Sequence, residues 1–93
     1  MTLDEIRSAV LKVVKEYPIS RVTLFGSRAK GTATENSDVD LIIEFSDPVT
    51  LITLSMVTQR LEELLHTGVD IIHGPVRNTD MFSIDKEIEI YAA

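Results

Sequence analysis

An apolar stripe in the middle of the chain constrains the fold more than any other feature. Its members recur at the 3.6-residue spacing of a helix that buries one face: Leu51, Leu54, Val57, Leu61, Leu64 and Leu65. Short apolar segments, 38–45 and 69–73, flank this helix and read as strands. Gly68 is the expected C-terminal cap of the helix.

The remaining segments complete an α/β (α+β) pattern. Two strands joined by a twelve-residue loop, and a third reached through the central helix, predict a small mixed sheet covered by helices. The final helix is expected to bury Phe82, Ile84, Ile88 and Tyr91. The other expected elements are a capped helix over about 3–16, a strand over 21–25, a Gly- and Ser-rich loop over 26–37 with room for one short helical turn, and that final helix over about 80–91.

Length and charge narrow the classes of protein and partner. Ninety-three residues predict a single domain, 1–93. A net charge of -6 argues against a direct nucleic-acid or membrane partner, so any phosphate must be held locally by a metal or a loop. The chain lacks cysteine and its first residues do not resemble a signal peptide, so we expect a reducing, cytoplasmic location.

The segment 26–31, Gly-Ser-Arg-Ala-Lys-Gly, follows directly after an expected strand. Glycines permit close backbone approach, and successive N–H groups with the Ser27 hydroxyl can form a nest for phosphate oxygens. Arg28 and Lys30 would add positive charge. The segment is not a Walker A sequence, and a Gly-bounded turn after a strand is more often purely structural.

Asp38 and Asp40 lie two residues apart at the start of an expected strand. Such residues project to the same face with backbones about 6.5 to 7 Å apart, so both carboxylates can converge on magnesium. The alternative is that Asp38 caps the strand and Asp40 is solvated. That alternative is weakened because Asp40 enters the apolar run 41–43, where an unpaired carboxylate is costly.

Asp70 lies between Val69 and Ile71 in another apolar strand. One interpretation is a buried carboxylate satisfied by backbone donors or by Arg60. If the two strands are neighbours, however, Asp70 can join Asp38 and Asp40 on one face. Three carboxylates so close together repel, which would raise their pKa values unless cations are bound.

These residues together resemble a known signature. Gly26-Ser27, ten intervening residues, Asp38-x-Asp40 and a later Asp70 are similar to the DNA polymerase beta-like nucleotidyltransferase superfamily. The strongest resemblance is to its minimal nucleotidyltransferases, which are usually paired with a HEPN-domain partner in bacterial and archaeal modules of toxin and antitoxin type. The resemblance covers nearly the whole chain.

The resemblance implies roles for the site residues. Gly26 and Ser27 would contact the triphosphate, whereas Asp38 and Asp40 would bind two magnesium ions. Asp70 would help to hold the catalytic metal and assist deprotonation of the acceptor. One departure is visible: Lys30 stands where these members commonly have arginine, so it keeps the charge but lacks the bidentate fork.

Three functions are compatible with these features. The first is magnesium-dependent transfer of a nucleotidyl group, AMP from ATP, to a hydroxyl on a HEPN partner within a hetero-oligomer. Because larger members use an additional domain to shape the acceptor pocket, a partner surface would supply the acceptor here. The second is a binding module that neutralises a HEPN protein by contact alone, and the third is an α/β domain whose carboxylates only cap and solvate.

Overall fold

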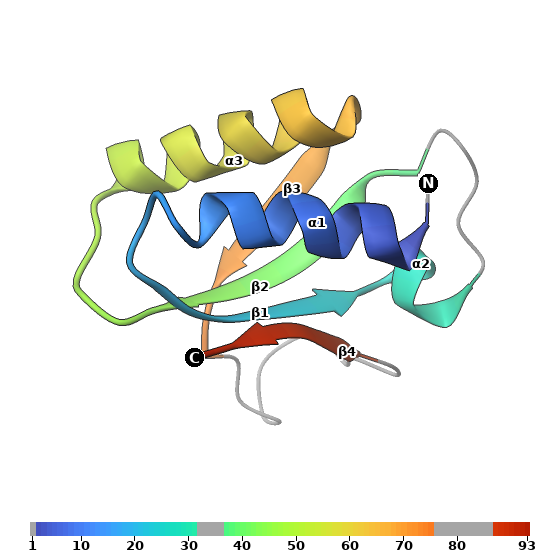
Figure 1. Ribbon diagram of the computed structural model, residues 1–93, viewed down its shortest axis with the longest axis horizontal. Helices are drawn as coiled ribbons and strands as arrows, with labels where there is room; N and C mark the ends of the chain where they lie inside the picture. Colours follow the sequence, from blue (N-terminus) through green and yellow to red (C-terminus); the bar gives the residue numbers. More distant parts are fainter. Residues whose placement is uncertain (1, 32–36, 76–86) are drawn as a thin grey trace.

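The computed structural model describes residues 2–31, 37–75 and 87–93. Two longer helices lie on one side of a sheet, and a single helical turn lies at one end of it (Figure 1). None of the helices in these ranges is both long and apolar enough to cross a membrane. The elements are α1 (Leu3–Val13), β1 (Ile19–Phe25), α2 (Ser27–Lys30), β2 (Val39–Phe45), α3 (Leu51–Leu65), β3 (Val69–His73) and β4 (Ile88–Ala92).

The sheet is mixed, as the sequence predicts. Its four strands lie in the order β3-β2-β1-β4. The central pair, β1 and β2, is antiparallel, and β3 pairs parallel with β2 after the crossover through α3. The strand β4 pairs antiparallel with the other edge of β1.

The core lies between the sheet and the two longer helices. Alternate residues of β2 face this layer, and Val39, Leu41 and Ile43 have no exposed surface. From the helices, Val10 and Val57 are equally well buried against them. The strand predicted over 38–45 is therefore confirmed and has one buried face, and the intervening residues of this strand point to the opposite face.

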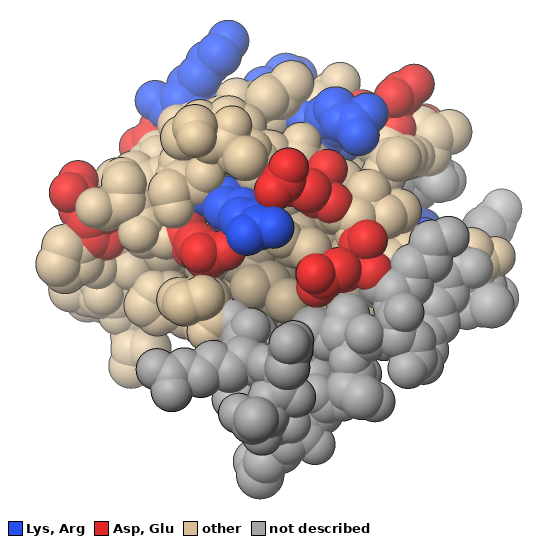
Figure 2. Space-filling model, turned by 90° about the horizontal axis from the view of Figure 1, so that it is seen from below, with Lys and Arg blue, Asp and Glu red and all other residues tan. Residues whose placement is uncertain are grey.

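The opposite face of the sheet carries no helix among the described residues, and charged side chains of both signs lie on it (Figure 2). Arg21 Nε lies 3.0 Å from Glu89 Oε1 and 3.8 Å from Glu44 Oε2. We call this side the open face. It is the face to which Asp40 belongs, because Asp40 alternates with the buried residues of β2.

The helix ends differ from the sequence prediction in two places. α1 begins at the predicted Thr2 cap but ends at Val13, before the predicted end at about residue 16. In the turn that follows, the N–H groups of Glu16 and Tyr17 both donate to the Val13 carbonyl. α3 is capped by His66, whose φ of 57° places it in the left-handed region. The prediction that Gly68 is the cap is wrong.

The predicted final helix is also wrong where the structure describes it. Residues 88–92 form β4, and Ile90 is buried at 6% exposure. The sequence from Glu87 to Ile90 alternates acidic and apolar residues, which is the period of a strand with one buried face. Phe82 and Ile84, the other expected members of the buried side, lie outside the described residues.

Candidate active site at the end of the sheet

The strand register brings the predicted site residues to one end of the open face. Asp40, on the central strand, is paired with Asp70 of β3 on one side and with Phe25 of β1 on the other. Residues paired across neighbouring strands project to the same face of a sheet. Gly26 and Ser27 follow directly after Phe25. The strands that carry Asp40 and Asp70 are therefore neighbours in the sheet, as the predicted carboxylate cluster requires.

The electrostatics agree with this proximity. Burial raises the pKa of Asp40, and the negative charges of Asp70 and Asp38 raise it further. Asp40 is half-buried, whereas Asp38 and Asp70 are exposed. Of the three carboxylates, Asp40 is therefore the one whose charged form is disfavoured by burial and by its two like-charged neighbours.

Two glycines leave room for the carboxylates. Gly26 has a φ of 74°, and a Cβ at this position would collide with Asp40 Oδ2. A Cβ on Gly68 would lie 2.5 Å from Asp38 Oδ1. Sequence analysis missed this role of Gly68, although a glycine directly before the strand that carries Asp70 was the available signal.

The turn after β1 is built as a short helix between two glycines. α2 starts after Gly26 and ends before its cap, Gly31, whose N–H donates to the Ser27 carbonyl. Ala29 is 3% exposed and anchors the turn in the core. This confirms the predicted helical turn and places the Ser27 backbone beside the strand end that faces Asp40. Lys30 is its last residue.

Arg28 lies within the same turn. Its Nη2 donates a hydrogen bond of 2.6 Å to the carbonyl oxygen of Ser37, the residue before Asp38. Its Nε is buried and has no hydrogen-bond partner among the described residues. The guanidinium therefore spans from α2 to the start of the carboxylate-bearing strand.

The carboxylates fit a magnesium site in their chemistry. Among residues 2–31, 37–75 and 87–93, no three acidic or histidine side chains already surround one point as a closed metal cage would. Magnesium does not require such a cage, because it is usually held by one or two carboxylates together with water and substrate phosphates. Burial is the largest cause of the raised pKa of Asp40, and the charges of Asp70 and Asp38 add to it; a divalent cation would offset this charge contribution.

Neighbouring residues have structural tasks. Arg60, offered above as a partner for a buried Asp70, instead pairs with Glu16 at 3.2 Å. Glu62 accepts a hydrogen bond of 3.1 Å from the Val69 N–H, so it helps to place the start of β3. His73 packs its ring against Phe45 at the far end of β3 from Asp70, with ring centroids 5.5 Å apart.

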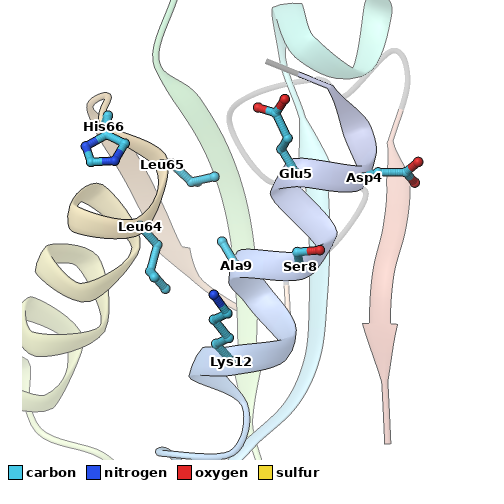
Figure 3. A pocket seen from close by; sticks show the side chains of 8 residues that line it. All are labelled: Asp4, Glu5, Ser8, Ala9, Lys12, Leu64, Leu65 and His66. Carbon is cyan, nitrogen blue, oxygen red and sulfur yellow. The ribbon is translucent and has the colours of Figure 1, made fainter.

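A separate hollow of about 370 Å³ opens between α1 and α3 (Figure 3). Glu5 and Lys12 flank it from α1, and Leu64 and His66 from α3. Its lining mixes acidic, basic and apolar groups. None of the three site carboxylates lines it, so it is distinct from the candidate active site.

The raised pKa of Asp40 gives a stability prediction. In metal-free buffer, we expect Asp40→Asn to raise the melting temperature at neutral pH, because asparagine removes the repelled charge. The folded protein holds the Asp40 proton more tightly than the unfolded chain, so wild-type stability falls as pH rises from the ordinary aspartate range through the raised pKa. The gain should therefore vanish in acid. Thermal melts across pH, with exposed Asp47→Asn as control, test this; a pH-independent difference would contradict it.

Comparison with known proteins gives the family. The profile described as "Nucleotidyltransferase domain" matches residues 5–91. MntA of Thermococcus cleftensis, a protein adenylyltransferase, is 33% identical over 76 residues, which are 77% of each chain.

Solved structures share the fold. A proposed minimal nucleotidyltransferase superposes with a TM-score of 0.66 at 38% identity, covering 78% of both chains. A chain from the complex of the tri-AMPylated Shewanella oneidensis HEPN toxin with an MNT antitoxin gives a TM-score of 0.71 at 14% identity, covering 99% of this chain and 74% of that one. With this fold, this profile match and the Gly-Ser turn beside Asp38, Asp40 and Asp70, the chain belongs to the nucleotidyltransferase domain family.

Proposed function

We propose that this protein transfers AMP from ATP to a hydroxyl group on a HEPN-domain partner and thereby acts as the antitoxin of a toxin–antitoxin pair. The observation that carries this proposal is the register of the sheet. It places Asp40 opposite both Asp70 and the residue that leads into the Gly26-Ser27 turn. Triphosphate-binding and cation-binding groups thus share one end of the open face.

The residues divide the work of binding. The Gly26-Ser27 turn holds the triphosphate, because its backbone approaches closely and its N–H groups and hydroxyl can donate to phosphate oxygens. Lys30 adds positive charge to this turn. Asp38 and Asp40 would hold two magnesium ions, and Asp70 would help to hold the catalytic one. Bound magnesium would activate the incoming oxygen and offset the charge of the leaving pyrophosphate.

The reaction is an in-line displacement. The acceptor oxygen forms a bond to the α-phosphorus as the bond from that phosphorus to the bridging oxygen breaks, and pyrophosphate leaves. The exposed carboxylate of Asp70 receives the acceptor proton and releases it to solvent. Its exposure suits this task, because an acceptor on another molecule must reach it.

Similar proteins support the donor and the acceptor. MntA of Thermococcus cleftensis is a protein adenylyltransferase, which favours ATP as donor and a protein as acceptor. In the Shewanella oneidensis complex, an MNT antitoxin is bound to a HEPN toxin that carries AMP. We extend both features to this chain.

The surface supports a protein partner. Near the start of α3, the side chains of Leu51 and Ile52 are 81% and 73% exposed, and Met56 on the next turn is 49% exposed. Large apolar side chains gathered on one exposed helix face favour protein contact. We therefore expect a hetero-oligomer. The net charge of -6 further favours a partner that is neither nucleic acid nor membrane, and we expect a cytoplasmic location from the sequence.

The same apolar surface keeps the contact-only function open. A protein that neutralises its partner by binding alone needs this surface but does not need the carboxylates. Asp38→Asn/Asp40→Asn separates the two functions: loss of neutralisation in cells that express the partner supports transfer. Full neutralisation by this variant would support contact alone.

The test of transfer uses ATP labelled at either the α- or the γ-phosphate, with magnesium and a lysate of the host. Because AMP is transferred and pyrophosphate leaves, we expect label on a discrete protein from α-labelled ATP and none from γ-labelled ATP. Label from γ-labelled ATP alone would indicate phosphoryl transfer by a kinase and would contradict nucleotidyl transfer. No label from either, with ATP bound, would contradict the proposal.

A further inference from the structure

Arg28 is partly buried, and its side chain is bonded to the backbone of the segment that precedes Asp38. Its Nη2 is committed to the Ser37 carbonyl at 2.6 Å, a short distance typical of a charge-assisted hydrogen bond. Its Nε has almost no exposed surface and no partner among the described residues. A phosphate oxygen therefore cannot reach the Nε edge, which is one half of the fork that arginine presents to phosphates.

The bond to Ser37 acts on the segment that carries Asp38. Ser37 precedes Asp38, and on the other side the Val39 N–H donates to the Gly68 carbonyl at 2.9 Å. Asp38 is thus fixed between an anchor on α2 and an anchor before β3. Loss of the α2 anchor would remove one of these two constraints on Asp38.

The anchor on α2 is itself rigid. The adjacent Ala29 is 3% exposed within the core, and its N–H donates to the Gly26 carbonyl at 3.2 Å. The Arg28 guanidinium, which extends from this packed turn, can therefore restrain the position of Ser37. The bond joins two residues nine positions apart, Arg28 in the phosphate-binding turn and Ser37 just before the carboxylate-bearing strand.

We propose that Arg28 is a positioning residue: through the Ser37 carbonyl it holds Asp38 in register with the Gly26-Ser27 turn, so that the cation and the triphosphate are bound side by side. This role rests on the proposed function. It differs from the phosphate contact that the sequence alone suggests for Arg28. The Nε N–H is buried without a hydrogen-bond partner among the described residues, which is unfavourable. The position of the side chain therefore favours the bond of Nη2 to the backbone over hydrogen bonding by Nε.

The two roles predict opposite effects on cation binding. Simple electrostatics says that removing a positive charge near carboxylates strengthens their affinity for a cation. If Arg28 positions Asp38, Arg28→Ala instead weakens that affinity, by about tenfold or more, as expected when a group that orients a ligand is lost. The sign of the change is therefore decisive.

The experiment measures Mn²⁺ affinity without nucleotide, from the loss of the free-ion electron paramagnetic resonance signal. We expect weaker binding in Arg28→Ala, an intermediate value in Arg28→Lys, and partial recovery of Arg28→Ala with millimolar guanidinium. Arg7→Ala is the matched control, since Arg7 is an exposed helix residue paired with Asp4 at 3.6 Å. Circular dichroism confirms folding, and Arg28→Lys carries the test if the alanine variant does not fold.

Transfer kinetics provide a second readout. We expect kcat to fall in Arg28→Ala while KM for ATP at saturating Mn²⁺ changes little. Unchanged or stronger Mn²⁺ binding together with a raised KM for ATP would overturn the positioning role and favour a phosphate contact. A wild-type protein that binds no Mn²⁺ would overturn the cation site of the proposed function, and this role of Arg28 with it.

Discussion

Replacing both Asp38 and Asp40 by asparagine is expected to lower nucleotidyl transfer by about 10³-fold or more. Loss of the cation removes several kcal/mol of transition-state stabilisation, and each 1.36 kcal/mol is a factor of ten in rate. Asparagine keeps the size of both side chains but removes the charge that would bind magnesium. Initial rates with α-labelled ATP and purified partner measure the loss.

The fold should survive this change. Asp40 is repelled by Asp38 and Asp70, so the neutral variant should melt no lower than the wild type in metal-free buffer. Asp47→Asn, an exposed aspartate away from the site, is the matched control and should keep full activity. Retained transfer in the double variant would refute the assignment of these carboxylates to magnesium.

Gly26→Ala is expected to damage the site severely although it adds a single methyl group. Gly26 has φ 74° and ψ -154°, a conformation that only glycine adopts readily, so alanine there should cost about 1–3 kcal/mol of stability. The new Cβ would also collide with the Asp40 carboxylate. A displacement of about 1 Å at a catalytic group can lower the rate about 10²-fold. Melting temperature and transfer rate should fall together.

Gly31→Ala separates backbone strain from the collision. Gly31 also has a positive φ, 80°, but nothing lies within 4 Å of the position of an added Cβ. Alanine there should cost about 1–2 kcal/mol for the left-handed backbone, with transfer largely retained below the melting temperature. Equal loss of activity in both variants would contradict the view that the close approach of Gly26 to Asp40 matters.

Local periodicity was enough to predict most of the fold. The stripe of α3 and the alternation in β2 each indicate which face is buried. Val57, Leu61 and Leu65 of the stripe are buried as predicted, whereas Leu51, its first member, is 81% exposed and lies outside the core. The C-terminal strand was missed because Ile84, Ile88 and Tyr91 recur at intervals of four and three, which also fit a helix. What decides for a strand is the free edge of β1, against which β4 pairs. That edge is a tertiary feature.

The candidate site was predictable in its residues but not in its contacts. The spacing of Asp38 and Asp40 placed them together. Their proximity to Asp70 required that the two strands be neighbours in the sheet, and the sequence alone did not establish this order. The close approach of Gly68 to Asp38 joins segments about thirty residues apart. The bond from Arg28 to the Ser37 carbonyl depends on the path of the backbone. The glycine before β3 marks a position in the sequence but not its partner, and the bond from Arg28 leaves no pattern in the sequence.

The most direct test of the central claim is the intact mass of a purified HEPN-domain partner after incubation with this protein, magnesium and ATP. We predict a mass increase of one or more adenylyl groups on the partner, located by fragmentation on a hydroxyl side chain and absent with Asp38→Asn/Asp40→Asn. A partner that is neutralised while its mass stays unchanged would contradict transfer and leave neutralisation to contact alone.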